Sequence, residues 1–245
     1  MKIAIIGYGK MGHAVEKAAI ERGHQIVSII DIDNHNDIDS DAFRSADVAI
    51  EFSNPEAAWG NFRDAWAQGV PVVSGSTGWF NPLKELELIE ECKKGATLFH
   101  APNFSVGVNV MNAAAILIAR LLAPYTDYST SIHEVHHVHK LDHPSGTAIL
   151  LANAQVEHSK YDAWGEPQMG PIADNAIPVT HERRGEVPGI HEITWDSPFD
   201  TITLRHEAKG REGFAIGAVA CAEWLLKHPR GAYYTIGDMY KEILK

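Results

Sequence analysis

Cysteine is scarce: the 245-residue sequence has only Cys92 and Cys221, which do not form a Cys-x-x-Cys pair. Two thiols are too few for a disulfide framework, so stability must come from a packed core, which a chain of this length can bury. Such cysteine usage suits a reducing compartment. We therefore predict a cytoplasmic protein.

Basic charge and long apolar runs are scarce as well. The sequence has 21 Lys and Arg against 32 Asp and Glu, a formal net charge of -11 at pH 7. This charge repels phosphate backbones and anionic membrane surfaces, and no run of basic residues offsets it. No segment approaches the roughly 18 apolar residues that span a bilayer. We predict neither a nucleic-acid partner nor a membrane partner.

The N-terminal part alternates short apolar strands with amphipathic helices. Strands are expected at 2–6, 24–31, 46–53, 70–78 and 96–103, and helices at 11–22, 55–68 and 81–94. Unbroken apolar strands that alternate with helices predict a parallel sheet covered on both faces. The predicted fold class is α/β, with a Rossmann-type, doubly wound first domain.

A different pattern begins near Val108. A long apolar helix and a histidine-rich stretch are followed by period-2 alternation at 177–184, 189–197 and 200–208. This alternation is typical of antiparallel strands with one face in water, so we predict a second domain of α+β type. Helical patterns at 213–226 and 231–244 end the chain. We expect them to pack back on one of the two domains.

The motif GYGKMG at residues 7–12 lies between the first strand and the first helix. Gly7 permits a tight turn, Gly9 lets the backbone approach a pyrophosphate, and Gly12 allows close helix packing. Asp31 ends the second strand, where an acidic residue binds the adenosine ribose of a dinucleotide. The motif predicts an NAD(P) site. The alternatives are a glycine turn without a ligand and an ordinary strand-end carboxylate.

Two further loops, GSTG at 75–78 and APNFSVGVN at 101–109, follow predicted strands of the same sheet. Ligands bind beyond the carboxyl ends of such strands, so both loops should line the crevice at the glycine turn. Their small residues suit a nicotinamide or its ribose. Each loop taken alone could also be an ordinary turn.

The stretch HEVHHVHKLDHPSGTA at residues 133–148 holds five of the fourteen histidines. It matches neither a His-Glu-x-x-His helix nor a Cys/His finger, so we predict no metal site. In an extended segment His136 and Lys140 share one side and could face one substrate together, while His137 and His139 share the other.

A predicted helix follows this stretch. It begins near Gly146 and Thr147, whose amides would form an anion cradle. A carboxylate ligand is favoured, and a solvated polar strand before a capped helix is the alternative.

Six segments, GYGKMG, GSTG, APNFSVGVN, EVHHVHKLDHPSGTA, RRGEVPGIH and REGFAIGAVACAEWLL, occur in this order. Together they resemble the 4-hydroxy-tetrahydrodipicolinate reductase (dihydrodipicolinate reductase) family over nearly the whole chain. The resemblance implies NAD(P)H-dependent reduction of a cyclic dicarboxylate imine, with loss of water, in the lysine and diaminopimelate pathway. It also implies a dinucleotide-binding domain of residues 1–107 plus 211–245. Residues 108–210 would then form a domain for substrate binding and assembly into a homotetramer.

The resemblance also implies roles for single residues. His136 is the general acid, Lys140 is a second proton donor or charge partner, and His137, Gly146 and Thr147 bind substrate. The implied cofactor-binding residues are Gly7, Tyr8, Gly9, Lys10, Met11, Gly12, Asp31, Gly75, Ser76, Thr77, Ala101, Pro102, Asn103 and Phe104.

One departure concerns the choice of cofactor. Ile32 and Asp33 follow Asp31, where some members carry a basic residue for the NADP 2′-phosphate. Asp31 should repel that phosphate, although Lys10 could reach it from the glycine turn. We expect NADH to be favoured, or both cofactors to be used.

Other functions stay open. A metal-dependent hydrolase would leave GYGKMG unexplained. A semialdehyde dehydrogenase would need a nucleophilic cysteine, and Cys221 lies in an apolar helical run instead. Another Rossmann oxidoreductase acting on a small dicarboxylate or imine, and a non-catalytic NAD-binding sensor, are further alternatives.

Overall fold

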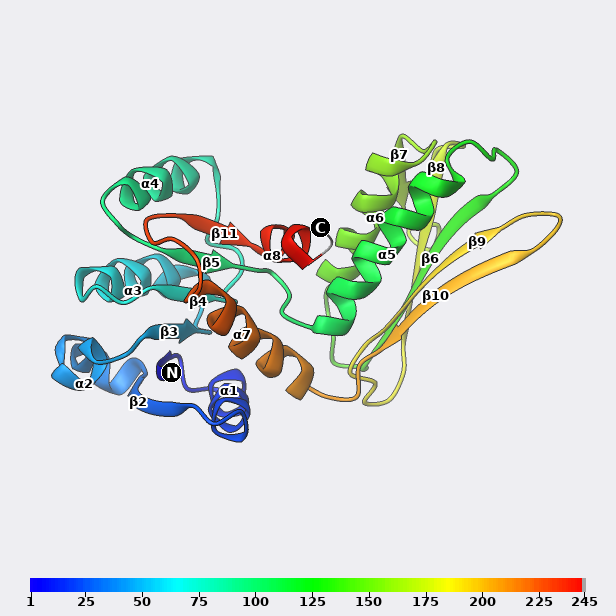
Figure 1. The fold of residues 1–245 in the computed structure, drawn as a ribbon. Helices are drawn as coiled ribbons and strands as arrows, with labels where there is room; N and C mark the ends of the chain where they lie inside the picture. The colour runs from blue at the N-terminus through cyan, green and yellow to red at the C-terminus, as the bar shows by residue number, and fades with distance from the viewer. Residues whose placement is uncertain (244–245) are drawn as a thin grey trace. The chain divides into compact units, whose positions relative to one another are not determined.

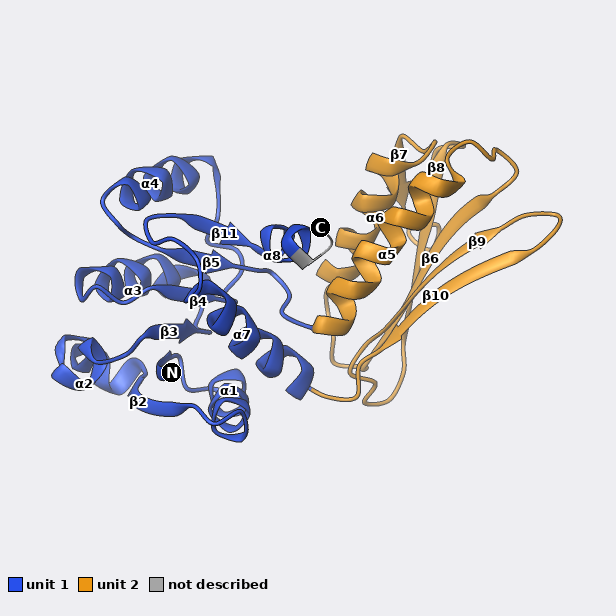
Figure 2. Cartoon of the chain, viewed as in Figure 1, with its two compact units in different colours: residues 1–105, 211–245 blue, residues 106–210 orange. Residues whose placement is uncertain are grey.

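The computed structural model describes residues 1–243 and divides the chain into two compact units. Unit 1 consists of Met1–Ser105 and Arg211–Lys245, and unit 2 of Val106–Gly210 (Figures 1 and 2). The chain therefore leaves the first unit once and returns to it. None of the described helices is long and apolar enough to cross a membrane.

Unit 1 is built on a six-stranded sheet in the order β11-β5-β4-β3-β1-β2, with all pairs parallel. The strands are β1 (Lys2–Ile6), β2 (Gln25–Ile30), β3 (Val48–Glu51), β4 (Val72–Ser74), β5 (Leu98–His100) and β11 (Tyr233–Thr235). The helices are α1 (Lys10–Glu21), the 3-10 helix η1 (Ile32–Asp39), α2 (Asp41–Arg44), α3 (Pro55–Ala67), α4 (Pro82–Lys93), α7 (Glu212–Leu225) and α8 (Ile236–Ile243). The strand order reverses between β1 and β3, and this switch point is where ligands bind in doubly wound sheets.

A hydrophobic core lies on each face of this sheet. Because side chains alternate along a strand, Ile3 and Ile5 belong to one core and Ala4 and Ile6 to the other. Residues of α1 and α7 complete the first core, and residues of α2, α3 and α4 complete the second. The predicted parallel sheet with two covered faces is confirmed.

The C-terminal segment differs from its prediction. Residues 231–244 were expected to be helical, but Tyr233–Thr235 forms β11 and pairs parallel with β5. Aromatic residues and threonine favour strands, and an edge position beside β5 was open to them. Helix α8 begins only at Ile236, and residue 244 of the predicted helix lies outside the described residues.

Unit 2 has a five-stranded sheet in the order β10-β9-β6-β8-β7. Its elements are α5 (Val106–Leu122), β6 (Ser129–His136), α6 (Gly146–His158), β7 (Ala163–Gly165), β8 (Ala176–Arg183), β9 (Ile190–Asp196) and β10 (Thr201–Glu207). Helices α5 and α6 cover one face, where Ile132, Leu151 and Trp195 are almost fully buried.

The prediction of antiparallel strands is wrong for β8. It runs parallel to both β6 and β7, whereas β9 runs antiparallel to β6 and β10. Period-2 alternation reports that one face is wet and does not report strand direction. Because α6 lies between β6 and β8 along the chain, the connection can return β8 in the direction of β6.

Candidate active site

The glycine turn after β1 has a different steric reason at each glycine. Gly7 has φ +88°, and a Cβ there would lie 2.2 Å from the carbonyl oxygen of Phe52. A Cβ on Gly12 would lie 2.3 Å from the oxygen of Gly7. A Cβ on Gly9, the N-cap of α1, would meet only open space. Because the space at Gly9 is open, the start of α1 is accessible to an anion such as a pyrophosphate.

Gly75, in the loop after β4, is required for a different steric reason. A Cβ there would lie 2.0 Å from the ring of Phe52.

The side chains within the glycine motif lie around this turn. Tyr8 donates a hydrogen bond to Glu16, and its ring centroid is 4.0 Å from that of His13. Lys10 is exposed, and Met11 packs partly against the hydrophobic core. Lys10 is therefore free of the core and can reach a bound phosphate.

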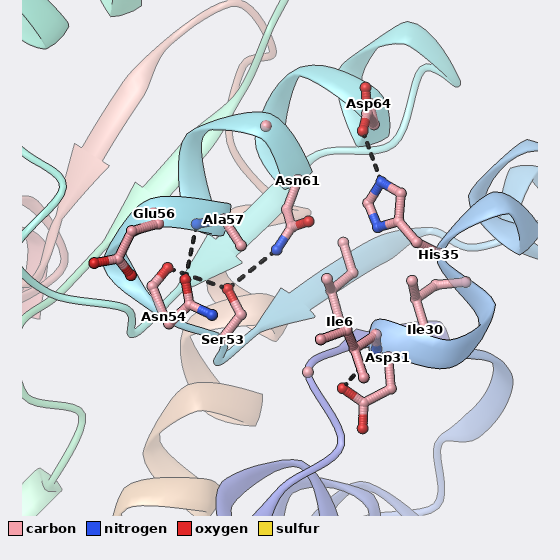
Figure 3. Close-up of a pocket in the computed structure, with 13 residues that line it drawn as sticks. Ile6, Ile30, Asp31, His35, Ser53, Asn54, Glu56, Ala57, Asn61 and Asp64 are labelled. Atoms are coloured by element: carbon pink, nitrogen blue, oxygen red, sulfur yellow. Dashed lines mark hydrogen bonds and ion pairs between the residues drawn. The ribbon is translucent and has the colours of Figure 1, made fainter.

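A cavity of about 380 Å³ opens beside the glycine turn, beyond the carboxyl ends of β1, β2 and β3 (Figure 3). Its lining residues are Ile6, Gly7, Ile30, Asp31, Ile32, His35, Ser53, Asn54, Glu56, Ala57, Gly60, Asn61 and Asp64. Asp31 caps η1, and its Oδ1 accepts the N–H of Ile32 at 3.0 Å. Nε2 of His35 lies 3.0 Å from Oδ2 of Asp64. The position and size of this cavity, together with the carboxylate of Asp31 after β2, fit the adenosine half of a dinucleotide.

The loop after β4 is held by a buried carboxylate. Glu51 is fully buried, and it accepts hydrogen bonds from the hydroxyls of Ser74 at 2.6 Å and Ser76 at 2.9 Å. Ser53 also donates its hydroxyl to Glu51, and the hydroxyl of Ser76 accepts the N–H of Ser53 at 2.9 Å. The hydroxyl of Ser76 is thus engaged in joining the ends of β3 and β4.

The remaining predicted cofactor positions differ in what they can offer. The side chains of Ala101 and Phe104 lie in the hydrophobic core, so only their backbone atoms could contact a cofactor. Thr77 and Pro102 are exposed, and Asn103 is half-buried. The loops after β4 and β5 would therefore contact a cofactor mainly through backbone groups and small side chains.

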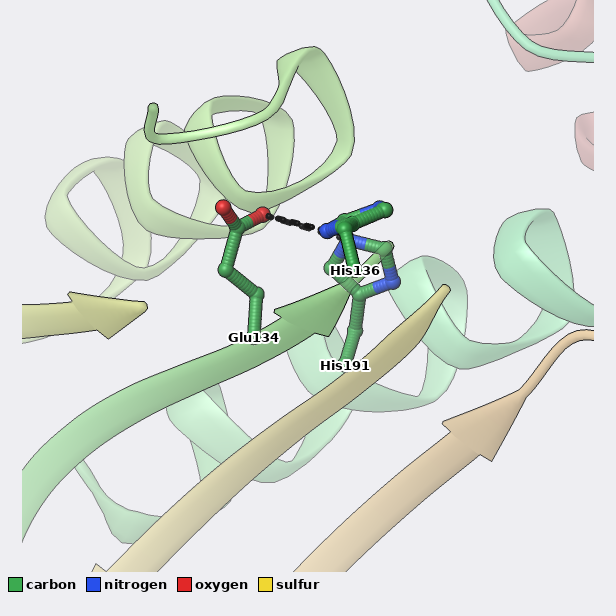
Figure 4. A group of neighbouring side chains, drawn as sticks. All are labelled: Glu134, His136 and His191. Atoms are coloured by element: carbon green, nitrogen blue, oxygen red, sulfur yellow. Dashed lines mark ion pairs between the residues drawn. The ribbon is translucent and has the colours of Figure 1, made fainter. Parts of the chain in front are cut away.

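In unit 2, the end of β6 carries a buried cluster around Glu134 (Figure 4). Glu134 lies opposite His191 of β9, and His136 lies opposite Arg183 of β8. One oxygen of Glu134 is 3.5 Å from Nδ1 of His136 and 3.6 Å from Nε2 of His191. The same oxygen accepts the N–H of Ser145 at 3.1 Å, and the other lies 3.3 Å from Nη2 of Arg183. The carboxylate is thus surrounded by donors.

This environment shifts the pKa of both partners. Burial lowers the pKa of His136 to about 4, although the charge of Glu134 opposes this. The neighbouring groups His191, Lys140 and Arg183 lower it further. Burial alone would raise the pKa of Glu134, but contacts with His191 and other donors outweigh burial and hold it at about 2. At neutral pH the pair is therefore a neutral imidazole beside a carboxylate.

The histidine-rich segment is not extended as far as Lys140. The prediction that His136 and Lys140 lie on one side of an extended strand is therefore wrong. Strand β6 ends at His136, and a turn follows in which the N–H of Lys140 donates to the oxygen of His137 at 3.1 Å. The N–H of Val138 is diverted to the oxygen of Gly185. The charge of Lys140 nevertheless acts on His136, so the turn still places an ammonium group near the imidazole.

The ammonium group of Lys140 is paired with a neighbouring carboxylate. Its Nζ lies 2.9 and 2.8 Å from the two carboxylate oxygens of Asp142. His137 is half-buried, and its Nδ1 is shielded from solvent without a hydrogen-bond partner among the described residues. A carboxylate ligand of Lys140 would compete with Asp142 for the ammonium group.

Helix α6 begins beside the same cluster. Its N-cap Ser145 accepts the N–H of Ala148 at 3.2 Å, and its Oγ lies 3.0 Å from Nε2 of His191. Gly146 is exposed and Thr147 is half-buried. The structure therefore brings the start of α6 to the cluster that contains His136, as one carboxylate-binding site would require.

Several residues of these sites were missed in the sequence, notably Glu134, His191, Arg183, Glu51 and His35. Glu134 and His136 occupy the inward-facing register of β6, in line with Ile132. A carboxylate at an inward strand position is a signal that alternation could have revealed. The partnership with His191 could not be seen, because it depends on strand register.

Two family profiles match the chain, dihydrodipicolinate reductase N-terminus over residues 1–104 and dihydrodipicolinate reductase C-terminus over residues 107–240. A 4-hydroxy-tetrahydrodipicolinate reductase of Christiangramia forsetii is 40% identical over 249 residues, which cover 100% of both chains. One of Archaeoglobus fulgidus is 32% identical, over 97% of this chain and 99% of that protein.

The fold matches a dipicolinate-bound dihydrodipicolinate reductase from Paenisporosarcina sp. TG-14. The TM-score is 0.74 at 22% identity, covering 96% of this chain and 97% of that one.

Proposed function

This chain belongs to the dihydrodipicolinate reductase family, and from that premise we propose which of its residues bind cofactor, bind substrate and move the proton. The chain is an NAD(P)H-dependent oxidoreductase of lysine and diaminopimelate biosynthesis. It reduces 4-hydroxy-tetrahydrodipicolinate to tetrahydrodipicolinate with loss of water.

Unit 1 binds the cofactor in this proposal. The pyrophosphate lies at the open start of α1 beside Gly9, and the adenosine ribose hydroxyls bind Asp31 in the 380 Å³ cavity. The loops after β4 and β5 contact the nicotinamide half through backbone groups. The cavity is lined by the carboxylates of Asp31, Glu56 and Asp64, which would repel the 2′-phosphate of NADPH. We therefore assign NADH as the favoured cofactor.

Unit 2 binds the dicarboxylate substrate. Lys140 and His137 contact carboxylates from the turn after β6, and the amides of Gly146 and Thr147 contact them from the start of α6. His136 is the general acid. The single observation that carries this assignment is the buried cluster: the imidazole of His136 lies 3.5 Å from Glu134, and the same carboxylate oxygen accepts the N–H of Ser145 at the start of α6.

When bound, the dihydronicotinamide supplies the hydride. The residues of the chain handle the proton that completes the reduction. Burial, and to a smaller extent neighbouring cationic groups, lower the pKa of His136, and the negative charge of a dianionic substrate acts in the opposite direction and favours the protonated imidazole. Glu134 keeps its low pKa, remains anionic and stabilises the imidazolium. His136 then gives its proton to the reduced ring.

We further propose a cytoplasmic homotetramer assembled through unit 2. Ser131 and Thr203 are exposed on the sheet face opposite α5 and α6, and Ser131 and Thr203 both pair with Thr194 of β9. This face offers a row of small polar side chains to a second copy. Light scattering after size-exclusion chromatography measures the assembly, and a monomeric mass would contradict the proposal.

The assigned activity is tested by a coupled assay in which the preceding synthase supplies its unstable product and nicotinamide absorbance is followed. We expect oxidation of cofactor that depends on synthase product, with both NADH and NADPH tried. Binding of NADH without substrate-dependent oxidation would instead favour a non-catalytic sensor. The cysteine alternative is disfavoured, since burial raises the pKa of Cys221 to about 12.

A further inference from the structure

Unit 2 holds a second group of histidines around a carboxylate, distinct in its residues from the cluster at His136. Oε2 of Glu166 lies 2.9 Å from Nδ1 of His143 and 3.2 Å from Nδ1 of His181. The two imidazole rings stack with centroids 4.4 Å apart and planes 18° apart. We propose that His143, Glu166 and His181 bind one Zn²⁺ ion, which ties the loop after β6 to β8 and to the segment after β7.

The spacing of the three ligand atoms suits zinc. One ring nitrogen of each histidine and one oxygen of Glu166 all lie within 4.8 Å of one another. Tetrahedral zinc with bonds of about 2.0 to 2.2 Å places neighbouring ligand atoms roughly 3.3 to 3.5 Å apart. The two separations from Glu166, 2.9 and 3.2 Å, need to open by only a few tenths of an ångström, and the two stacked rings must turn so that a nitrogen of each faces the ion. Two imidazoles and one carboxylate are a common zinc ligand set that leaves a fourth position for water.

The state of His181 provides a separate argument. Its Nδ1 is shielded from solvent and has no hydrogen-bond partner of acceptable geometry, although it lies beside Glu166. A buried polar nitrogen without a partner costs free energy. A cation between His181 and Glu166 would satisfy the nitrogen lone pair and the carboxylate at once.

Charge distinguishes this group from the cluster at Glu134. There, Arg183 lies 3.3 Å from Glu134, and Ser145 occupies Nε2 of His191, so a cation would meet a guanidinium and an engaged imidazole. Among the described residues, Glu166 forms ion pairs with His143 and His181 and with no lysine or arginine. The carboxylate of Glu166 is therefore available to neutralise an ion.

Contacts outside the three ligands already fix their positions. Gln168 accepts the N–H of His181 at 2.8 Å and donates to its carbonyl oxygen at 2.9 Å, which joins β8 to the segment after Glu166. Such supporting contacts orient metal ligands. His143 lies two residues before the N-cap Ser145. An ion here would order the loop that carries Lys140, without contacting the substrate.

The test uses the full-length chain with any affinity tag removed, stripped with chelator and titrated with ZnCl₂. We expect one equivalent per chain by elemental analysis after dialysis, and a higher thermal unfolding midpoint with zinc. His143→Ala and His181→Ala should each lose the equivalent and the thermal shift. His139→Ala is the matched control, because His139 belongs to the same stretch and lies 3.2 Å from Glu186 on the surface.

A further variant and a second metal ion distinguish loss of the zinc site from loss of the fold. Glu166→Gln keeps the size of the side chain and should weaken zinc binding at least tenfold while far-ultraviolet circular dichroism stays unchanged. Co²⁺ should give the strong visible absorption of a tetrahedral site in the parent and not in His143→Ala. The proposal is overturned if the parent binds no stoichiometric zinc, or if both histidine variants retain it. It is equally overturned if His136→Gln loses the ion, because the ion would then belong to the catalytic cluster.

Discussion

Nδ1 of His136 lies 3.5 Å from a carboxylate oxygen of Glu134, and both side chains are buried. The pKa of the imidazole is lowered to about 4, mainly by burial, and that of the carboxyl group to about 2, because its donors outweigh burial. At neutral pH the chain therefore holds an imidazole without its proton next to an anion. In the proposed mechanism, the negative charge of the substrate favours uptake of the proton that His136 then donates.

This pair makes stability depend on pH. An unfolded histidine titrates near 6.5, so below that pH the unfolded chain binds a proton that folded His136 does not take up until pH about 4. Stability should fall as pH falls through this window. Urea unfolding at pH 7 and pH 5 should show the parent losing about 2 kcal/mol more than His136→Gln. Equal losses in the two proteins would contradict the lowered pKa.

Removing the acid should act on turnover. His136→Gln keeps a hydrogen-bonding side chain of similar size but cannot deliver a proton. We expect turnover to fall by roughly a hundredfold to ten-thousandfold, the usual range for general acid catalysis. Fluorescence titration should show unchanged NADH binding. Turnover within about twofold of the parent would assign His136 a structural role instead.

Lys140 should contribute to both binding and turnover, since a charge held against the substrate acts in the ground state and in the transition state. Lys140→Ala should raise KM and lower kcat. Asp142→Asn removes the present partner of Lys140, 2.8 Å away, and should not raise KM. Lys94→Ala, which breaks only an exposed pair with Glu91, is the control. An unchanged KM in Lys140→Ala would remove Lys140 from the binding site.

Local patterns explain why much of unit 1 could be predicted. Apolar runs define β1 to β5, and the spacing within GYGKMG matches three different steric demands at Gly7, Gly9 and Gly12. Each of these features is decided within a few residues of sequence. The short strand Tyr233–Thr235 was missed because only its tertiary partner β5 makes it a strand.

The parts of unit 2 that could not be predicted depend on long-range register. Glu134 meets His191 because β6 and β9 pair in one particular alignment, although the two residues are 57 positions apart along the chain. His143 meets Glu166 and His181 for a similar reason, and a metal-ligand pattern confined to residues 133–148 could not include the latter two. The turn at 137–140 was missed because alternation does not say where a strand ends.

Glu51 should matter through the loops it holds. Gln at this position would turn an amide donor toward the hydroxyls of Ser53, Ser74 and Ser76, which now donate to the carboxylate. Glu51→Gln should cost about 1 to 3 kcal/mol of unfolding free energy and weaken NADH binding more than it changes the substrate KM. Glu90→Gln, which changes an exposed carboxylate of α4 outside the cavity beside the glycine turn, is the control. Unaltered stability in Glu51→Gln would show that the loops do not depend on this carboxylate.

The charge of the cavity beside the glycine turn should decide between NADH and NADPH. Three carboxylates, Asp31, Glu56 and Asp64, line the cavity, and His35 is already paired with Asp64 at 3.0 Å. Among the described residues, no lysine or arginine lines it. A 2′-phosphate brought to this rim would be repelled. Because the repulsion is between partly exposed charges, added salt should weaken it.

We therefore expect kcat/KM with NADH to equal or exceed kcat/KM with NADPH. The difference between the two values should decrease as ionic strength rises. Asp31→Ser should move the ratio toward NADPH by about tenfold, or roughly 1.4 kcal/mol, because it removes the repulsive charge and replaces the carboxylate acceptor of the ribose with a weaker hydroxyl acceptor. Lys10→Ala should lower the remaining use of NADPH, since Lys10 is exposed beside the glycine turn. A parent enzyme that prefers NADPH by about tenfold would show that a cation outside this rim reaches the phosphate.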